Sequence, residues 1–226
     1  MFIVYISGID GCGKTTQAKL LVEELQKQGL DADYMWFRWE PSFRKIINAF
    51  RTVKTKHTVA AKTDIVESEN TEQGDWLKFK RNILSNSVVR RLWLLYACFD
   101  YFTAYRRGFR KITSEVIVID RYVDDFIIDQ AINLKMPPEQ SYLIKKNFFL
   151  KKFHFPDFNI IINLPAMEGY TRKSDGTSLS YLETREKYYQ TMTDSKTIHL
   201  DGLERINDLS DKIRIWIFSQ LKVTGT

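Results

Sequence analysis

The amino-acid sequence predicts an α/β domain in which a parallel β-sheet is covered by helices on both faces. Three observations lead to this prediction. An apolar run at 2–7 has the composition of a central parallel strand that is buried on both faces. A glycine-rich loop at 8–15 joins that run directly to a stretch with helical periodicity. Further along the chain, strand-like and helix-like segments alternate, which is typical of βαβ units.

Length and composition limit the classes of protein to consider. The 226 residues fit one domain, and we expect 1–226 to form a single domain. The net charge of +6 favours an anionic partner, and we interpret it as steering nucleotides into a basic cleft rather than as nucleic-acid binding. No apolar run reaches the roughly 20 residues that span a bilayer. We therefore expect a soluble, cytoplasmic protein with no membrane partner, in which Cys12 and Cys98 are free thiols.

The first elements follow from local patterns. The run 2–7 leads straight into the glycine loop, which favours a buried strand over a signal peptide. Periodic apolar positions predict a helix over 15–29 that ends at a glycine. The next predicted elements are a strand at 32–37 and a short basic amphipathic helix at 41–50. The apolar pattern is lost at 52–75, where we expect a mobile insertion.

The later elements alternate in the same way. Helical periodicity returns at 76–111, as one long helix or two. After the first strand, the strand prediction is clearest at 116–119, because this run is entirely β-branched and apolar. The remaining predicted elements are helices at 127–134 and 141–153, a strand at 158–164, a helix at 182–192, a strand at 197–200 and a helix at 208–221.

The loop between the first strand and helix matches the phosphate-binding pattern GxxxxGK[ST] without a mismatch. Its glycines let backbone N–H groups approach phosphates, and the following helix directs its positive end at them. Lys14 can neutralise the β- and γ-phosphates of ATP, and the Thr15 hydroxyl can bind Mg²⁺. The fold class is therefore that of a P-loop NTPase. The residues expected to bind ATP are Gly8, Asp10, Gly11, Cys12, Gly13, Lys14, Thr15 and Thr16.

Asp120 and Arg121 follow the apolar strand at 116–119. A carboxylate at the carboxyl end of a parallel strand lies at the edge of the sheet where ligands bind, so Asp120 is a candidate Mg²⁺ ligand beside Thr15. Arg121 is placed to hold a phosphate. The alternative is that the two side chains form only a salt bridge.

The chain resembles the thymidylate kinase family of nucleoside monophosphate kinases. The segment 6–17 resembles that family's phosphate loop, including an aspartate inside the loop that contacts the acceptor sugar. The resemblance implies this role for Asp10, although a loop aspartate without such a role is the alternative. Trp39-Glu40-Pro41 lies where the family has Arg-Glu-Pro, whose arginine grips the acceptor phosphate. We assign this role to Arg38, with Arg44 or Arg51 as substitutes.

Two further segments resemble the acceptor side of the family. In 94–100, Tyr96 takes the place of the aromatic residue that stacks on thymine, and Asp100 replaces the arginine that reads the base. In 120–130, Gln130 is kept, but Asp125 and Asp129 are carboxylates at positions that line the pocket. Carboxylates at Asp100, Asp125 and Asp129 suit an amine-bearing acceptor at least as well as they suit thymine. The alternative is that Asp100 and Asp125 form salt bridges with arginines, for which the candidates are Arg90, Arg91, Arg106 and Arg107.

Arg172 falls where the family has an arginine on a mobile lid. The resemblance implies a lid at about 169–181 that brings Arg172 onto the transferring phosphoryl group. Arg185 and Lys187 lie on the helix that follows, and we interpret both as a solvated helix face.

The resemblance implies a function: Mg²⁺-dependent transfer of the ATP γ-phosphoryl group to dTMP or a related nucleotide. The catalytic residues would be Asp10, Lys14, Arg121 and Arg172, and the acceptor site would include Arg38, Tyr96, Asp100, Arg121, Asp125 and Gln130. The alternatives are a kinase for another nucleotide or a deoxynucleoside, and a non-catalytic ATP-binding module. Family members are commonly homodimers, and the aromatic helix with Trp93, Phe99 and Phe102 is compatible with that assembly.

Overall fold

The computed structural model describes residues 1–42, 86–173 and 177–224. Within these residues, five parallel strands form one sheet in the order β2-β3-β1-β4-β5. The strands are β1 (Phe2–Gly8), β2 (Ala32–Trp36), β3 (Val116–Asp120), β4 (Phe158–Asn163) and β5 (Thr197–Asp201). The predicted α/β fold with a parallel sheet is confirmed.

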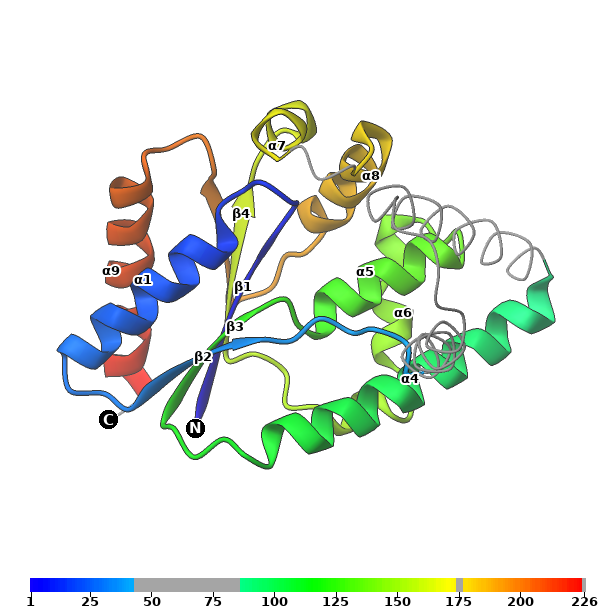
Figure 1. Cartoon of the computed structure of the whole chain (residues 1–226), viewed down its shortest axis with the longest axis horizontal. Coiled ribbons are helices and arrows are strands. Elements are labelled where there is room, and N and C mark those ends of the chain that lie inside the picture. The colour runs from blue at the N-terminus through cyan, green and yellow to red at the C-terminus, as the bar shows by residue number, and fades with distance from the viewer. Residues whose placement is uncertain (43–85, 174–176, 225–226) are drawn as a thin grey trace, which may run out of the picture.

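Helices cover both faces of this sheet. Figure 1 shows α1 (Lys14–Lys27) and α9 (Ile206–Thr224) together on one face. The other face is covered by α4 (Ser87–Phe109), α5 (Val123–Asn133), α6 (Tyr142–Lys145) and α8 (Leu179–Gln190). The short helix α7 (Ala166–Arg172) lies over the carboxyl edge of the sheet, and two single 3₁₀ turns occupy Pro138–Gln140 and Leu150–Lys152. In the described residues, no helix is both long and apolar enough to cross a bilayer.

The central strand β1 positions the phosphate loop. Its side chains from Ile3 to Ile6 are almost inaccessible to solvent, as expected for a strand covered on both faces. Each such buried apolar side chain stabilises the fold by about 1.5–3 kcal/mol. In the register with β3, Ile6 lies opposite Asp120. The last residue of β3 is therefore next to the start of the loop.

Some predicted boundaries were wrong for local reasons. The helix expected at 141–153 is broken after Lys145, because the Asn147 side chain accepts the backbone N–H of Phe149 and forms a turn. The helix expected from 127 begins at Val123, with two acidic residues in its first turn that favour a helix start. Ser178 caps α8 by accepting the N–H of Tyr181, so that helix begins before 182.

The helix predicted at 76–111 is a single helix in its described part, α4, whose N-terminus is capped by Asn86. The predicted helix at 41–50 and the predicted insertion at 52–75 lie almost entirely outside the described residues. The proposed lid at 169–181 is described except for 174–176, with α7 and the start of α8 on either side.

Candidate functional site

The phosphate loop at 8–15 joins the carboxyl end of β1 to α1. Gly8, Gly11 and Gly13 all have positive φ, a region that favours glycine. Gly13 caps the N-terminus of α1, and a Cβ atom built on it would meet no heavy atom within 4 Å among the described residues. The first residues of α1, Lys14, Thr15 and Thr16, line a cavity together with Gly13, which is where a helix N-terminus can bind an anion.

A cavity of about 260 Å³ opens over this loop, and we call it the phosphate cavity. Its lining includes most of the residues predicted from the motif together with three cations from other segments: Asp10, Gly11, Gly13, Lys14, Thr15, Thr16, Trp36, Arg38, Asp120, Arg121 and Lys173. Gly8 and Cys12 are not in that lining, and the buried Cys12 side chain packs beneath Gly8. Burial raises the pKa of the Cys12 thiol, so the thiol is neutral at physiological pH.

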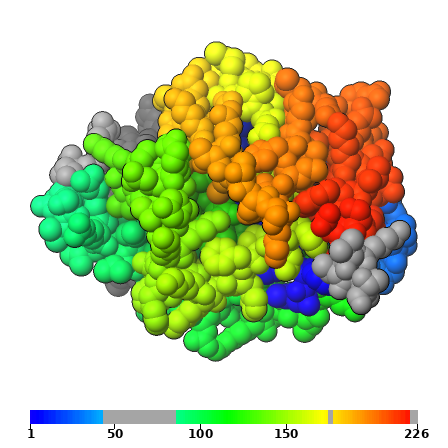
Figure 2. All heavy atoms as spheres, turned by 180° about the vertical axis from the view of Figure 1, so that it is seen from behind, coloured from blue at the N-terminus to red at the C-terminus, as the bar shows by residue number. Residues whose placement is uncertain are grey.

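A second cavity of about 190 Å³ lies where α8 meets the ends of β4 and β5. Figure 2 shows this side, where dark blue atoms of the N-terminal segment appear in a hollow between yellow and orange segments. The charged residues of its lining are Glu186 and Asp201, and among the described lining residues there is no lysine or arginine. A phosphate therefore fits the first cavity and not the second.

Lys14 is folded back over the loop. Its Nζ atom donates to the carbonyl oxygen of Ile9 at 2.9 Å and lies 3.8 Å from Asp10 Oδ1. The side chain is almost fully buried. A phosphate bound to the loop amides would replace the Ile9 carbonyl as the acceptor of the ammonium group.

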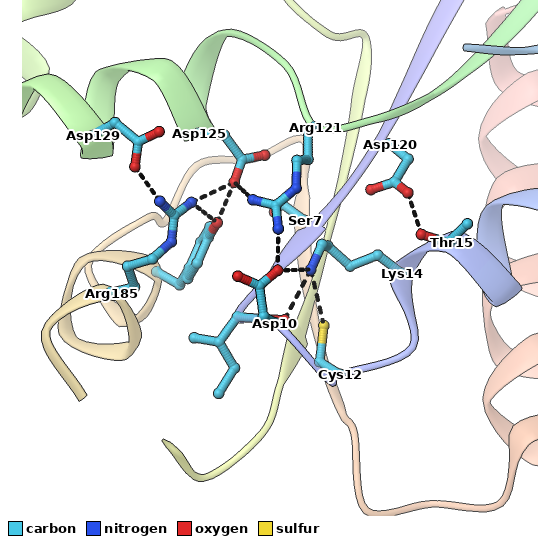
Figure 3. A network of polar contacts seen from close by, with 12 residues as sticks. Ser7, Asp10, Cys12, Lys14, Thr15, Asp120, Arg121, Asp125, Asp129 and Arg185 are labelled. Atoms are coloured by element: carbon cyan, nitrogen blue, oxygen red, sulfur yellow. Dashed lines mark hydrogen bonds and ion pairs between the residues drawn. The ribbon is translucent and has the colours of Figure 1, made fainter. Parts of the chain in front are cut away.

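Asp10 and Arg121 form the centre of the site (Figure 3). Arg121 has φ of 66°, which is strained for a non-glycine residue, and its Nη2 donates to Asp10 Oδ1. Lys173 Nζ lies 3.9 Å from the same carboxylate oxygen. Burial alone would raise the pKa of Asp10, but Arg121, Lys14 and Lys173 outweigh it and hold that pKa below its ordinary value. Asp10 is therefore ionised at neutral pH.

Thr15 and Asp120 lie side by side, as a magnesium site needs. Thr15 Oγ1 donates to Asp120 Oδ2, and the Tyr34 hydroxyl donates to the same oxygen at 3.3 Å. Asp120 Oδ1 is buried and has no hydrogen-bond partner among the described residues. An unpartnered carboxylate oxygen beside a hydroxyl fits Mg²⁺, which P-loop proteins hold with one hydroxyl, one carboxylate and the phosphates.

Arg38 and Asp100, both expected to bind the acceptor, have different surroundings. Arg38 is exposed and lines the phosphate cavity. Asp100 is buried, and its Oδ2 accepts Trp39 Nε1–H at 2.9 Å and the backbone N–H of Ser42 at 3.0 Å. Asp100 thus ties the segment after β2 onto α4. In the described residues, none of the four candidate arginines pairs with Asp100 or Asp125: Arg90, Arg91, Arg106 and Arg107.

Gln130 is completely buried on α5, and its Oε1 accepts the indole N–H of Trp93 at 3.0 Å. An indole nitrogen only donates, so the amide orientation is fixed and Nε2 is the other end of the side chain. Nε2 has no hydrogen-bond partner in the described part of the chain. Tyr96 is half-buried beside Trp93, with ring centroids 6.0 Å apart.

Asp125 and Asp129 are both paired with Arg185, which corrects the interpretation of Arg185 as a solvated residue. Arg185 is 1% exposed, and its Nη2 lies 2.6 Å from Asp125 Oδ1 while its Nη1 donates to Asp129 Oδ1. Lys187 is exposed, as predicted. The signal missed in the sequence is the helical spacing, because Arg185 follows the buried Leu182 by three positions.

Arg172 does not line the phosphate cavity in this structure. Its Nε donates to Glu168 Oε1 at 2.9 Å and its Nη1 donates to the Gly202 carbonyl at 3.0 Å. The neighbouring Lys173 lines the cavity instead.

Comparison with known proteins gives low but extended similarity. No family model matches the chain. It is 23% identical to the thymidylate kinase of Caldanaerobacter subterraneus subsp. tengcongensis, over 90% of this chain and 88% of that protein. It is 27% identical to a probable thymidylate kinase of Pyrococcus abyssi, over 76% and 69% of the two chains. It is also 24% identical to the thymidylate kinase of Plasmodium falciparum, over 94% and 87%. These similarities support a thymidylate kinase-like nucleotide kinase.

Proposed function

We propose that the chain is a nucleoside monophosphate kinase that transfers the γ-phosphoryl group of ATP to dTMP or a closely related nucleotide. The observation that carries this proposal is the cavity over the phosphate loop. It is lined by Lys14 of the loop and also by Arg38, Arg121 and Lys173 from other segments. ATP binding alone needs the loop, whereas transfer between two phosphorylated molecules needs cations from several sides.

The roles of the residues follow from their positions. The loop amides and Lys14 would hold the phosphates of ATP, and Thr15 and Asp120 would hold Mg²⁺, which neutralises phosphate charge when bound. Arg121 lines the cavity beside Asp10, and we propose that it contacts both donor and acceptor phosphates there. Asp10 is ionised, and we propose that it orients the acceptor sugar by accepting a hydroxyl. Catalysis then consists mainly of alignment and charge neutralisation.

The polar groups on the acceptor side favour a base with a carbonyl group. Gln130 Nε2 is a buried donor that lacks a partner among the described residues. Asp100 and Asp125 already accept donors from the protein, so they have less capacity to read an amino group. A carbonyl-bearing base such as thymine satisfies the unused Gln130 donor. Tyr96 is proposed as the stacking residue, and Arg38 as the group that holds the acceptor phosphate.

We also propose that 169–181 acts as a lid. In this conformation Lys173 already reaches the cavity, while Arg172 pairs with Glu168 and Gly202. For Arg172 to stabilise the transferring phosphoryl group, its contacts with Glu168 and the Gly202 carbonyl must break on ligand binding and be replaced by a contact with the phosphoryl group. A cytoplasmic location remains a prediction.

The test is a coupled ADP-release assay with ATP, Mg²⁺ and a panel of nucleoside monophosphates and deoxynucleosides. Preferential turnover of dTMP supports the proposal as stated. Preference for another nucleotide or a deoxynucleoside keeps the kinase and reassigns the acceptor pocket. ATP binding without acceptor-stimulated turnover favours the alternative of a non-catalytic ATP-binding module.

Asp120→Asn is expected to raise the Mg²⁺ concentration for half-maximal activity at least about tenfold, because an amide keeps the shape but removes the charge facing the metal. The measurement is a Mg²⁺ titration of ADP release at fixed ATP and acceptor. Asp33→Asn is the control, since Asp33 is an exposed carboxylate on β2. An unchanged Mg²⁺ requirement in Asp120→Asn contradicts the metal role.

We propose a homodimer that forms through α4. Four apolar side chains with 51–62% exposure lie on one face of this helix: Val88, Leu92, Leu95 and Phe99. Of the aromatic residues noted in the sequence, only Phe99 belongs to this exposed face, because Trp93 and Phe102 are half-buried. A row of exposed apolar side chains of this kind marks an interaction surface.

Leu95→Glu is expected to raise the dimer dissociation constant by at least about tenfold, since it places a charge in the centre of an apolar interface. Light scattering coupled to size-exclusion chromatography measures the mass over a concentration series. Ile215→Glu is a matched control, because Ile215 is a similarly exposed apolar side chain. It lies on α9, which covers the opposite face of the β-sheet from α4. A wild-type protein that remains monomeric throughout the series rules out this interface.

A further inference from the structure

A continuous line of opposite charges runs from α8 to the phosphate loop (Figure 3). Arg185 on α8 contacts Asp125 on α5, Asp125 contacts Arg121 at the end of β3, and Arg121 contacts Asp10 in the loop. We propose that Arg185 is a positioning residue that, through Asp125, keeps the Arg121 guanidinium directed into the phosphate cavity. This inference rests on the proposed function, in which Arg121 contacts the phosphates.

Arg185 is too deeply buried for a surface role. A guanidinium with 1% exposure must be paired, because an isolated buried charge is very costly. Four acceptors meet its two terminal nitrogens. Nη1 contacts Asp129 and the Tyr181 hydroxyl at 3.0 Å, and Nη2 contacts Asp125 and the Tyr189 hydroxyl at 2.8 Å. The side chain is therefore held in one orientation.

Asp125 is the point at which the two arginines meet. Its Oδ1 lies 2.6 Å from Arg185 Nη2 and 3.7 Å from Arg121 Nη1. Its Oδ2 accepts the Tyr5 hydroxyl at 2.5 Å, and Tyr189 donates to Oδ1. Burial alone would raise the pKa of Asp125, but Arg121 and Arg185 lower it, so the carboxylate stays ionised.

The two distances from Asp125 Oδ1 explain why Arg185 matters for Arg121. At 2.6 Å Arg185 makes a short charge-assisted contact, whereas at 3.7 Å Arg121 is beyond normal hydrogen-bond length. Arg121 instead uses Nη2 to bond Asp10 at the cavity. Without Arg185, the buried Asp125 carboxylate would have Arg121 as its nearest cation. We expect Arg121 to move toward Asp125 and away from the phosphates.

A double-mutant cycle tests this coupling. Arg185→Met removes the charge and keeps much of the volume, and it is expected to lower kcat about 30–100-fold with a smaller change in KM for the acceptor. In the Asp125→Asn background, where position 125 has no carboxylate to draw Arg121 away from Asp10 and the cavity, the same substitution is expected to change kcat by less than about threefold. Arg185→Lys is expected to recover part of the loss, because a lysine reaches one carboxylate but lacks the planar fork. Lys187→Met is the control on the same helix.

The outcomes separate positioning from other roles. An equal loss in both backgrounds overturns the inference, because Arg185 would then act independently of Asp125. A lower melting temperature with unchanged kcat also overturns it, since the residue would be purely structural. If Arg185→Met does not fold, kcat is compared between Arg185→Lys and the double variant Arg185→Met/Asp125→Asn. The double variant is expected to fold, because neither position 185 nor position 125 then carries a buried charge.

The inference can be judged even if the proposed function fails. Should the wild-type protein transfer no phosphoryl group to any nucleotide, NMR of ¹⁵N-arginine-labelled protein reports the guanidinium signals directly, with Arg121→Lys identifying the Arg121 signals. We expect those signals to shift in Arg185→Met and to shift much less when the same substitution is made in the Asp125→Asn background. Unchanged Arg121 signals in Arg185→Met overturn the positioning role.

Discussion

Lys14→Met is expected to lower kcat/KM for ATP by about 10²–10³-fold, the loss typical when a group that stabilises transition-state charge is removed. Methionine keeps much of the side-chain length and removes the charge. Lys14 is the only cation within the loop 8–15, and its ammonium group is almost fully buried beside the cavity. Burial excludes water that would otherwise screen its interaction with the phosphates.

The measurements are steady-state kinetics, ATP binding by calorimetry and thermal unfolding. Unfolding matters because Lys14 also satisfies the Ile9 carbonyl, and its loss is expected to destabilise the fold by about 1–3 kcal/mol. Lys27→Met at the far end of α1 is the control, since Lys27 is exposed and pairs only with Glu24 among the described residues. If Lys14→Met retains a third or more of wild-type kcat/KM, Lys14 does not contact the transferred phosphoryl group.

The phosphate loop and its scaffold could be predicted because their signals are local. An apolar run, a glycine pattern and an amphipathic helix follow one another within 29 residues of sequence. The parallel register then places Asp120 beside the loop, since both lie at carboxyl ends of adjacent strands. Predicting the loop and the position of Asp120 requires the order of the strands in the sheet. It does not require any contact between side chains that are distant in the sequence.

The partners of the acidic residues could not be predicted, because they are separated by about 60 positions along the chain. Asp100 bonds to Trp39, and Asp125 pairs with Arg185. A charged residue on a helix is usually solvated, so the sequence alone predicts a surface position for Arg185. Only the three-dimensional packing of α8 against α5 shows that its guanidinium satisfies two carboxylates one helical turn apart.

The phosphate loop also depends on a close backbone contact with α7. Gly11 has φ of 87°, and a Cβ atom on it would lie 2.7 Å from the Gly169 carbonyl oxygen. A Cβ atom on Gly169 would in turn lie 2.7 Å from the Asp10 carbonyl oxygen. Both distances are shorter than van der Waals contact allows. The two glycines therefore let α7, at the start of the proposed lid, pack directly on the loop.

Gly11→Ala is expected to lower kcat/KM about 100-fold, because a displacement of the loop by about 1 Å is enough to misalign the phosphates. Gly29→Ala is the matched control. Gly29 has a similar φ of 82°, but a Cβ atom on it meets no heavy atom within 4 Å in the described residues. Both substitutions place alanine in the left-handed region at a cost of about 1–2 kcal/mol, which lowers the melting temperature by roughly 2–8 °C in a protein of this size.

Only Gly11→Ala adds the clash with Gly169, so the two variants separate backbone strain from loop geometry. We expect Gly29→Ala to lose thermal stability but to keep ATP affinity and kcat, and Gly11→Ala to lose all three. Calorimetric ATP titration and ADP-release kinetics at a temperature where both variants are folded provide the comparison. Equal catalytic losses in the two variants would mean that strain alone is responsible. Wild-type kinetics in Gly11→Ala would mean that α7 yields to the added methyl group, and that the close contact with the loop is not required for phosphate binding.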